Sequence, residues 1–551
     1  MFFTVIAKKN NMKKRLGLWS LLCVLFVMTL QMTAVAAERA TISSCIISGK
    51  DEVKVTVQIP SIVESDDANY YLFELKPYQN DIGNRTDYCG VTIKNAVVTF
   101  SARLHYKQAD SRLYSKFVAA ILKDGQYVAI SDMAYITNPE AIAQYTVANP
   151  KTTSIKGITA DNAAILDLEE LGVQHASYEM GVNRFFAPSV SGYVNYNFGG
   201  KTYQFNKDIV SQFDMVMSVF ESQKVEVTMN LVNYYADETL FTIKPNARKA
   251  GYTHYAYNTD EQYGVESLEA LIAFLAERYS GHGHGLISNW IIGNEVNNNN
   301  PWYYSGDYQV DDYVTEYEKA YRMFYNGIKA VNANARVLTC IDQRWTWEDG
   351  TANQYGAKRF LDIFHARIRS HGDIDWGIAW HPHPVPLYAP KFWDMPAGYK
   401  SLNLVTHATN TKMISPMNME VFTNYMTQPT MLNSKGQVRY IIVSEILFNS
   451  NSATVEASEE LQAAAFAYAY KLADKNPYIK AFIVHRIVDS PQEQASDGIS
   501  CGLYQCDANG MPTDKKKIYD VYKYIDTDQS DAYTKFALPI IGAGSWGQII
   551  K

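Results

Sequence analysis

The sequence predicts an α/β protein in which eight strand–helix units close into a parallel barrel, preceded by a small all-β domain. From residue 139 onward, strand-like and helix-like segments alternate, which is typical of a parallel sheet. Residues 38–138 instead hold short segments with period-two alternation, clearest in 53–59. The 551 residues exceed one ordinary domain, and the 47% hydrophobic content can form a large core.

The first 37 residues have the organisation of a secretory signal peptide. A basic stretch at 8–15 precedes an apolar segment at 16–32, and the small residues 34–37 follow. We therefore expect a secreted, extracellular protein, with an uncleaved anchor as the alternative. No later segment is long and apolar enough to span a bilayer, so no membrane contact is expected after cleavage. The net charge of −7 gives no reason to expect nucleic acid as a partner.

Residues 38–138 are expected to form a sandwich of the immunoglobulin type, because short alternating strands follow one another at close spacing. A structural accessory role is predicted, with glycan binding as the alternative. Since oxidising surroundings permit disulfides, Cys45–Cys89 and Cys501–Cys506 are candidate pairs. Cys340 lies inside an apolar run and is expected to be a buried thiol.

Residues 139–551 are predicted to form a TIM barrel with long loops after the strands. The expected strands are 154–158, 175–180, 225–232, 290–293, 336–341, 376–380, 440–444 and 479–485. The expected helices are 161–171, 208–223, 266–279, 314–331, 357–370, 417–426, 459–474 and 515–525. A doubly wound open sheet is the alternative, but the sequence has no Gly-rich phosphate loop to favour it.

Two glutamates follow predicted buried strands. Glu295 comes directly after the fourth strand, next to Asn294, and Glu445 ends the seventh strand. In a barrel, catalytic groups lie at the carboxyl ends of the strands. Glycoside hydrolysis needs two carboxyl groups, one to protonate the leaving oxygen and one to attack or to activate water. Glu295 and Glu445 are therefore the predicted catalytic pair, and Asn294 is predicted to hydrogen-bond a sugar hydroxyl.

The runs Gly293-Asn294-Glu295 and Val443-Ser444-Glu445 resemble the strand-four and strand-seven motifs of clan A retaining glycoside hydrolases. The resemblance covers about residues 150–530 and includes the segment 502–515, which is similar to the hairpin after strand eight. It implies that Glu295 is the acid/base and Glu445 the nucleophile. The whole chain is similar to a secreted bacterial family known only as a domain of unknown function.

One position departs from the clan pattern. Many clan members have a tryptophan at the end of strand eight as a sugar platform, whereas this chain has His485-Arg486. The resemblance therefore does not name the sugar, the linkage, or endo against exo action.

The sixth predicted strand ends in Trp380-His381-Pro382-His383. Residues i and i+2 of a strand face the same side, so His381 and His383 are predicted to point together into the mouth of the barrel. The resemblance to clan A, in which a histidine or tyrosine near this position contacts the substrate or the nucleophile, implies that they bind substrate. A zinc site is the alternative for this pair, but no further ligand is apparent at short spacing, and neither metal nor cofactor is expected. Four further strand-end residues are predicted to bind substrate: Asn183, Asn233, Arg344 and Trp345.

These features predict a glycosidase that takes a poly- or oligosaccharide and retains anomeric configuration. Two alternatives stay open. One is a non-catalytic glycan-binding protein on a degenerate barrel, and the other is a metal-dependent hydrolase that uses His381 and His383. The sequence does not determine the oligomeric state.

Overall fold

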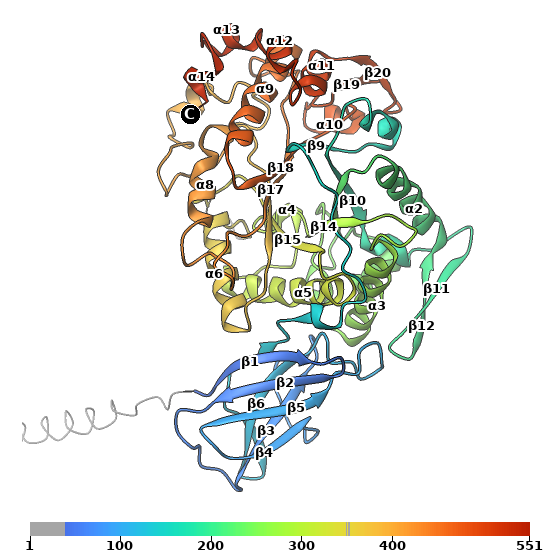
Figure 1. Cartoon of the computed structure of the whole chain (residues 1–551), viewed down its shortest axis with the longest axis vertical. Helices are drawn as coiled ribbons and strands as arrows, with labels where there is room; N and C mark the ends of the chain where they lie inside the picture. Colours follow the sequence, from blue (N-terminus) through green and yellow to red (C-terminus); the bar gives the residue numbers. More distant parts are fainter. Residues whose placement is uncertain (1–38, 349, 351–352, 551) are drawn as a thin grey trace, which may run out of the picture.

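The computed structural model describes residues 39–348, 350 and 353–550 (Figure 1). An all-β region at the N-terminal end lies beside a larger α/β barrel. The predicted signal peptide falls outside the described residues, and its cleavage and the secretion it implies stay predictions. Within the described residues, no helix combines the length and apolarity needed to cross a membrane.

The N-terminal region contains two antiparallel sheets. The first has the order β1 (Thr41–Ser48), β2 (Glu52–Gln58) and β5 (Val97–Arg103). The second has the order β4 (Gly90–Ile93), β3 (Asn69–Leu75), β6 (Lys116–Lys123) and β7 (Gln126–Ala129), and β8 (Ala134–Tyr135) pairs with β6. Val53, Val55 and Val57 alternate into the core with 0% exposure, as period-two patterning requires. The all-β character agrees with the prediction, while the immunoglobulin type stays a prediction.

This region packs on the outer helix layer of the barrel, chiefly on α5 (Val310–Val331). Asn326 Nδ2 of α5 donates a hydrogen bond of 2.9 Å to the Leu113 carbonyl. Gly327 of α5 allows the Tyr114 ring to approach, because a Cβ there would lie 2.9 Å from the Tyr114 hydroxyl oxygen. The β region thus supports the barrel from its side.

Eight parallel strands form a closed barrel, as predicted. In order around the barrel they are β9 (Lys156–Thr159), β10 (His175–Gly181), β13 (Glu226–Val232), β14 (Ile287–Ile292), β15 (Arg336–Ile341), β16 (Gly377–Trp380), β17 (Ile441–Ile446) and β18 (Ile479–Val484). The barrel closes where β18 pairs with β9, with Phe482 opposite Lys156. A small set of apolar side chains fills the interior, including Ile291, Leu338 and Ile483. The inside of the barrel is therefore a packed core, and a functional site is expected at the carboxyl ends of the strands.

Helices cover the outside of the barrel (Figure 1). Besides α5 they are α2 (Lys207–Ser222), α3 (Gln262–Arg278), α6 (Ala357–Ser370), α8 (Met419–Met426), α9 (Glu459–Lys475) and α11 (Lys517–Tyr524). The first predicted helix is instead a short 3-10 helix, η2 (Asn162–Leu168). Its backbone leaves helical geometry at Ala164, where φ is −135°, so an α-helix does not propagate.

The loops carry two hairpins and several short helices. The hairpins are β11 (Tyr193–Phe198) with β12 (Lys201–Asn206), and β19 (Tyr504–Cys506) with β20 (Pro512–Lys515). The short helices are η1 (Pro139–Ile142), η3 (Val182–Phe186), η4 (Asp237–Thr242), η5 (Pro245–Ala247), α4 (Asn299–Trp302), α7 (Ala397–Lys400), η6 (Pro416–Asn418), α10 (Pro491–Ser496), α12 (Ser530–Thr534), α13 (Ala537–Ile541) and α14 (Trp546–Ile549). The second hairpin lies where the sequence predicts it, after strand eight.

The expected disulfides are wrong for this structure. All five described cysteines are free thiols: Cys45, Cys89, Cys340, Cys501 and Cys506. Cys89 Sγ donates to the Leu72 carbonyl at 3.4 Å, and Cys501 is buried with its Sγ 3.9 Å from a Glu493 oxygen. One thiol of each expected pair therefore has a local partner other than a cysteine. Cys340 is fully buried, as predicted.

Candidate active site

Glu295 is held at the carboxyl end of β14 by a tight turn. Gly293 has φ +78° and Glu295 itself has φ +40°, so the chain turns sharply as it leaves the strand. Glycine is required at 293 because a Cβ would lie 2.6 Å from the Tyr303 ring. The Val296 amide then donates to the Cys340 carbonyl at 2.9 Å, which fixes the turn to β15. The turn leaves Glu295 only 8% exposed.

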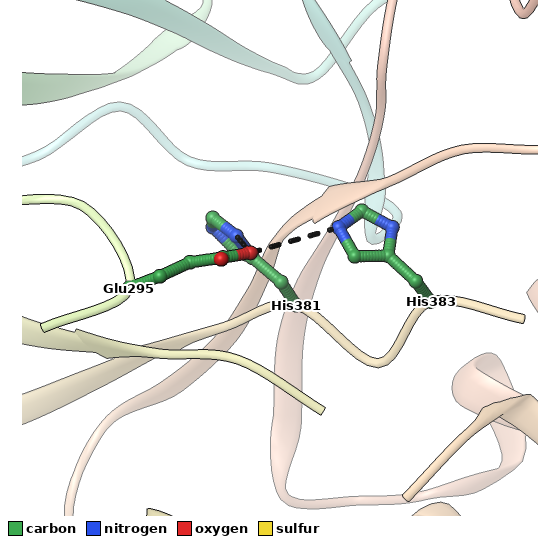
Figure 2. Close-up of side chains that lie close together, drawn as sticks. All are labelled: Glu295, His381 and His383. Atoms are coloured by element: carbon green, nitrogen blue, oxygen red, sulfur yellow. Dashed lines mark hydrogen bonds and ion pairs between the residues drawn. The ribbon is translucent and has the colours of Figure 1, made fainter. Parts of the chain in front are cut away.

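Two imidazoles from the segment after β16 meet the Glu295 carboxylate (Figure 2). His381 Nδ1 donates to Glu295 Oε1 at 3.0 Å, and His383 Nε2 lies 3.9 Å from the same oxygen. Both imidazoles are buried, with 2% and 4% exposure. The prediction that His381 and His383 point the same way is confirmed, and both face the predicted acid/base.

Glu445 extends from β17 (Ile441–Ile446) toward the same nitrogen of His383. Glu445 Oε1 lies 3.7 Å from His383 Nε2, and its side chain is 30% exposed. Because one nitrogen lies within 4 Å of an oxygen from each glutamate, the two oxygens are at most about 8 Å apart, a bound that includes the retaining separation of about 5–5.5 Å. The structure thus brings together the two predicted glutamates, which are far apart in the sequence.

The charges around Glu445 favour its carboxylate form. Burial opposes ionisation, but four imidazoles outweigh it and lower the pKa of Glu445 to about 2. In order of decreasing effect, they belong to His485, His381, His383 and His254. Glu445 is therefore a carboxylate at any pH near neutrality, the form that a nucleophile needs.

The four histidines differ in their charge state. Burial opposes protonation of His381, but Cys340 Sγ at 3.4 Å and the carboxylates of Glu445 and Glu295 raise its pKa well above the ordinary histidine value. Burial likewise opposes protonation of His485, while Glu445 and a hydrogen bond to Glu493 raise its pKa. His381 and His485 thus favour the cationic form beside the two glutamates.

His383 and His254 favour the neutral form. Burial lowers the pKa of His383 to about 4, even though Glu445 acts against that shift. Burial also lowers the pKa of His254 to about 4. At neutral pH His383 is therefore a neutral imidazole between two carboxyl groups, able to donate one hydrogen bond and accept another.

A third carboxyl group, Glu179, lies in the same site and was not predicted. It comes from β10, and its side chain is 43% exposed. Tyr234 donates a hydrogen bond to Glu179, and His254 Nε2 lies 3.8 Å from the other oxygen. The Tyr234 ring sits on Gly181, where a Cβ would lie 2.7 Å from it. Although this side chain is partly exposed, the protein atoms around its carboxyl group desolvate it and raise the pKa of Glu179, and the Glu445 carboxylate adds to the effect.

Asn294, which precedes Glu295 in the chain, and Arg344 are both held in place by hydrogen bonds to neighbouring residues. Asn294 Oδ1 accepts from Asn230 Nδ2 at 3.1 Å, which orients the amide next to Glu295. Arg344 Nε donates to Asp342 Oδ2 at 2.6 Å, and Asn297 Nδ2 donates to the other Asp342 oxygen at 2.7 Å. The pKa of Asp342 is raised by burial, against which Arg344 acts. The substrate roles of Asn294 and Arg344 stay predictions.

Three other predicted substrate residues have their polar atoms engaged within the protein. Asn183 bonds to Thr239 and to the Tyr234 amide, and Asn233 bonds to Thr242. Trp345 is 2% exposed, and its Nε1 donates to the Thr409 carbonyl at 3.0 Å. These atoms would have to give up their partners in the protein before they could bind a sugar.

The sequence carries only weak signals for the residues that were missed. Glu179 and His485 lie at the ends of predicted strands two and eight, where catalytic groups are expected in a barrel. His254 lies in the long segment between β13 and α3, and no spacing in the sequence points to it.

Two groups in the described part of the chain could hold a metal ion. Glu295, His381 and His383 present ligand atoms that all lie within 4.8 Å of one another. His485, Glu493 and Cys501 form the other group. There, Arg486 Nη1 donates at 3.2 Å to the Glu493 oxygen that also contacts His485, so the guanidinium competes with a cation for that oxygen. The sequence missed the first group because its carboxylate lies 86 residues from the histidine it binds.

Several solved structures are similar to this chain at low sequence identity. A family 39 glycoside hydrolase from Bacteroides cellulosilyticus is 13% identical, with a TM-score of 0.43 over 90% of this chain and 83% of that one. The β-glucosidase of Pyrococcus furiosus is 15% identical, with a TM-score of 0.45 over 69% of this chain and 88% of its own. A Bacteroides uniformis β-glucuronidase is 10% identical, with a TM-score of 0.38 over 88% of this chain and 50% of its own. The chain spans half the length of that enzyme, and likenesses this distant carry no argument about activity.

No curated protein matches the sequence. A family model described as a family of unknown function (DUF5722) matches residues 148–549. The match covers the barrel and well over half of the chain, in agreement with the resemblance that the sequence predicted. The chain therefore belongs to this family of unknown function, DUF5722.

Proposed function

We propose that the protein is a secreted glycoside hydrolase that cleaves a poly- or oligosaccharide by a retaining, double-displacement mechanism. The observation that supports this most strongly is the convergence of Glu295 and Glu445 on His383, each from its own strand end. A barrel that had lost its activity would have no need to keep two carboxyl groups in this relation.

In the first step, Glu445 attacks the anomeric carbon of the bound sugar while Glu295 protonates the departing glycosidic oxygen. The bond from carbon to that oxygen breaks as the bond to the Glu445 oxygen forms. The low pKa of Glu445 keeps it ionised for the attack. Among the described residues, His381 and His383 contact Oε1 of Glu295, so the other carboxyl oxygen can hold the proton that is transferred.

In the second step, Glu295, now a carboxylate, takes a proton from water, and that water displaces Glu445 from the sugar. Two inversions at the same carbon leave the configuration unchanged. His383 Nε2 lies 3.9 Å from a Glu295 oxygen and 3.7 Å from a Glu445 oxygen, so a small rotation of its ring would bring it within hydrogen-bond distance of either one. In this proposal His383 positions the pair and does not itself react.

The most direct test uses activated 2-deoxy-2-fluoroglycosides of different sugars, which trap the glycosyl-enzyme. We expect one member of the panel to add its sugar mass to the peptide that contains Glu445, and the Glu445→Gln variant to stay unlabelled. Proton NMR of early products should show retained configuration. A label on a different residue or an inverted product would overturn the assignment of roles.

Secretion needs its own test, because the signal segment lies outside the described residues. The full-length chain, expressed in a bacterial host, should appear outside the cytoplasmic membrane without residues 1–37. An intact N-terminus on the recovered protein would refute cleavage at this position.

A further inference from the structure

We propose that Glu295, His381 and His383 form a binding site for a transition-metal dication such as Zn²⁺, which switches the proposed hydrolase off by occupying its acid/base. The site itself goes beyond the proposed function, since it can bind metal whether or not the protein cleaves sugars. Only the inhibitory consequence rests on that function.

The ligand atoms already lie close to the spacing that zinc requires. His381 Nδ1 and His383 Nε2 lie 3.0 Å and 3.9 Å from Glu295 Oε1. Zinc bonds of about 2.0–2.1 Å in a tetrahedron set ligand atoms about 3.3 Å apart. Small side-chain rotations therefore suffice, and no backbone movement is needed.

A second carboxylate near the three ligands supplies further negative charge. Glu445 Oε1 lies 3.7 Å from His383 Nε2, but Glu445 lies outside the group of ligand atoms that are all within 4.8 Å of one another, so a water would complete the coordination. Two carboxylates would neutralise a dication in a site where the two imidazoles are only 2% and 4% exposed. Two nitrogen ligands favour Zn²⁺, Cu²⁺ or Ni²⁺ over Mg²⁺, which prefers oxygen.

The surroundings of the two imidazoles point to reversible binding. A histidine that ligates zinc usually donates its other ring N–H to a strong partner, and loss of that partner costs about 10–100-fold in affinity. Within the described residues, His383 Nδ1 has no hydrogen-bond partner, and His381 Nε2 contacts Cys340 Sγ, at 3.4 Å, where a zinc-ligating histidine usually has a carboxylate or carbonyl oxygen. We therefore expect zinc to bind about 10–100-fold more weakly than at a site where both imidazoles have strong partners, which suits inhibition more than permanent structural binding.

Occupation would disable the catalytic pair directly. A metal bound to Glu295 Oε1 would keep the carboxyl group ionised, so the other oxygen would not carry the proton that the leaving oxygen needs. The nearby positive charge would also weaken Glu445 as a nucleophile. Zinc and substrate would then exclude each other.

The binding experiment uses the purified full chain and ZnCl₂ alone, followed by isothermal titration calorimetry, with MgCl₂ as the comparison ion. We expect one zinc per chain and no magnesium binding. Glu295→Gln and His383→Gln should each weaken zinc binding at least about 100-fold, with circular dichroism to verify the fold. Glu295→Gln preserves side-chain shape, so it tests the site even if His383→Gln misfolds.

The matched control is the sequence His282-Gly283-His284, which has the same spacing as the site pair and lies on a surface loop. The double variant His282→Gln/His284→Gln should bind zinc as the native chain does. Loss of binding in this control, or unchanged binding in both site variants, would overturn the proposed site.

The inhibitory consequence is tested by adding zinc before a fluoroglycoside label. Zinc should prevent labelling of Glu445, and EDTA should restore it. Zinc binding without labelling by any sugar would leave the site intact and refute the hydrolase, whereas labelling without zinc binding would refute the site alone. Turnover that requires zinc would overturn the inhibitory role and favour a metal-dependent hydrolase.

Discussion

Replacing Glu295 by glutamine separates a catalytic role from a structural one. The glutamine side chain of Glu295→Gln would keep the volume of the original and an oxygen that accepts the 3.0 Å hydrogen bond from His381 Nδ1. What the substitution removes is the negative charge and the ability to carry a transferable proton. We therefore expect a large loss of activity with little loss of stability.

The expected loss of stability and the expected loss of activity can both be estimated from this geometry. A hydrogen bond to a charged group contributes about 1.5–3 kcal/mol and a neutral one about 0.5–1.5 kcal/mol, so the variant should lose about 1 kcal/mol of stability. For a chain of this length, that loss shifts Tm by less than about 4 °C. General acid catalysis contributes about 10²–10⁴-fold, or about 2.7–5.5 kcal/mol of the barrier at 1.36 kcal/mol per tenfold.

The assay compares aryl glycosides of the responsive sugar that differ in leaving group. With 4-nitrophenyl or poorer leaving groups, kcat/KM of Glu295→Gln should fall by about 10²–10⁴-fold. With 2,4-dinitrophenyl, departure needs no proton, so cleavage should be almost unaffected until hydrolysis of the glycosyl-enzyme limits turnover. Azide added to Glu295→Ala should accelerate that step and give a glycosyl azide of retained configuration.

Glu456→Gln serves as the control, because this exposed carboxylate lies 3.5 Å from Lys391 at the surface and should leave kcat/KM unchanged when its charge is removed. Full activity of Glu295→Gln on poor leaving groups would refute the assignment of Glu295 as the general acid. The assignment also fails if the loss is the same for every leaving group, because Glu295 would then not act as the acid.

Three other predictions follow from the same structure. Glu445→Gln should lower kcat/KM by more than about 10⁴-fold whatever the leaving group, because the nucleophile acts in the first step; residual activity that varies with leaving group would contradict this. The pKa of Glu445 is depressed from 4.5 to about 2, so its contribution to stability is present above pH 4.5 and is lost as pH falls through about 2. Urea unfolding between pH 5 and pH 2 should therefore show a steeper loss for the native chain than for Glu445→Gln, and parallel curves would refute the depressed pKa. Gly157→Ala should destabilise the barrel by about 1–3 kcal/mol, because its Cβ would lie 2.8 Å from Ile483 Cγ1; an unchanged urea midpoint would show that β9 and β18 can separate.

The fold was predictable because it rests on local patterning. β15 (Arg336–Ile341) and α6 (Ala357–Ser370) have the bounds that hydrophobic periodicity predicts. β14 begins earlier than predicted, at Ile287. The prediction left out Ser288 and Asn289 because they are polar, yet both are fully buried in the strand. The Asn289 amide is satisfied by Glu226 and Thr228 on the neighbouring strand, a compensation that the sequence does not display.

The candidate site was predictable only in part. Glu295, Glu445 and the histidine pair were found because each follows an apolar strand. Trp345 was predicted at a strand end by the same rule, yet it packs edge-on against Tyr425, at a ring-centroid distance of 4.9 Å, inside the outer helix layer. Position after a strand therefore selects candidates, but the path of the loop decides which of them face the site.

The sequence by itself determined the barrel and the two strand ends that carry Glu295 and Glu445, because strand and helix periodicity are properties of neighbouring residues. Only the tertiary structure decided that His383 stands between the two glutamates, that Glu179 joins them, and that Glu295 completes a ligand set with two histidines. The physical reason is that these relations cross the barrel. They depend on closure between β18 and β9 and on loop paths that no local pattern encodes.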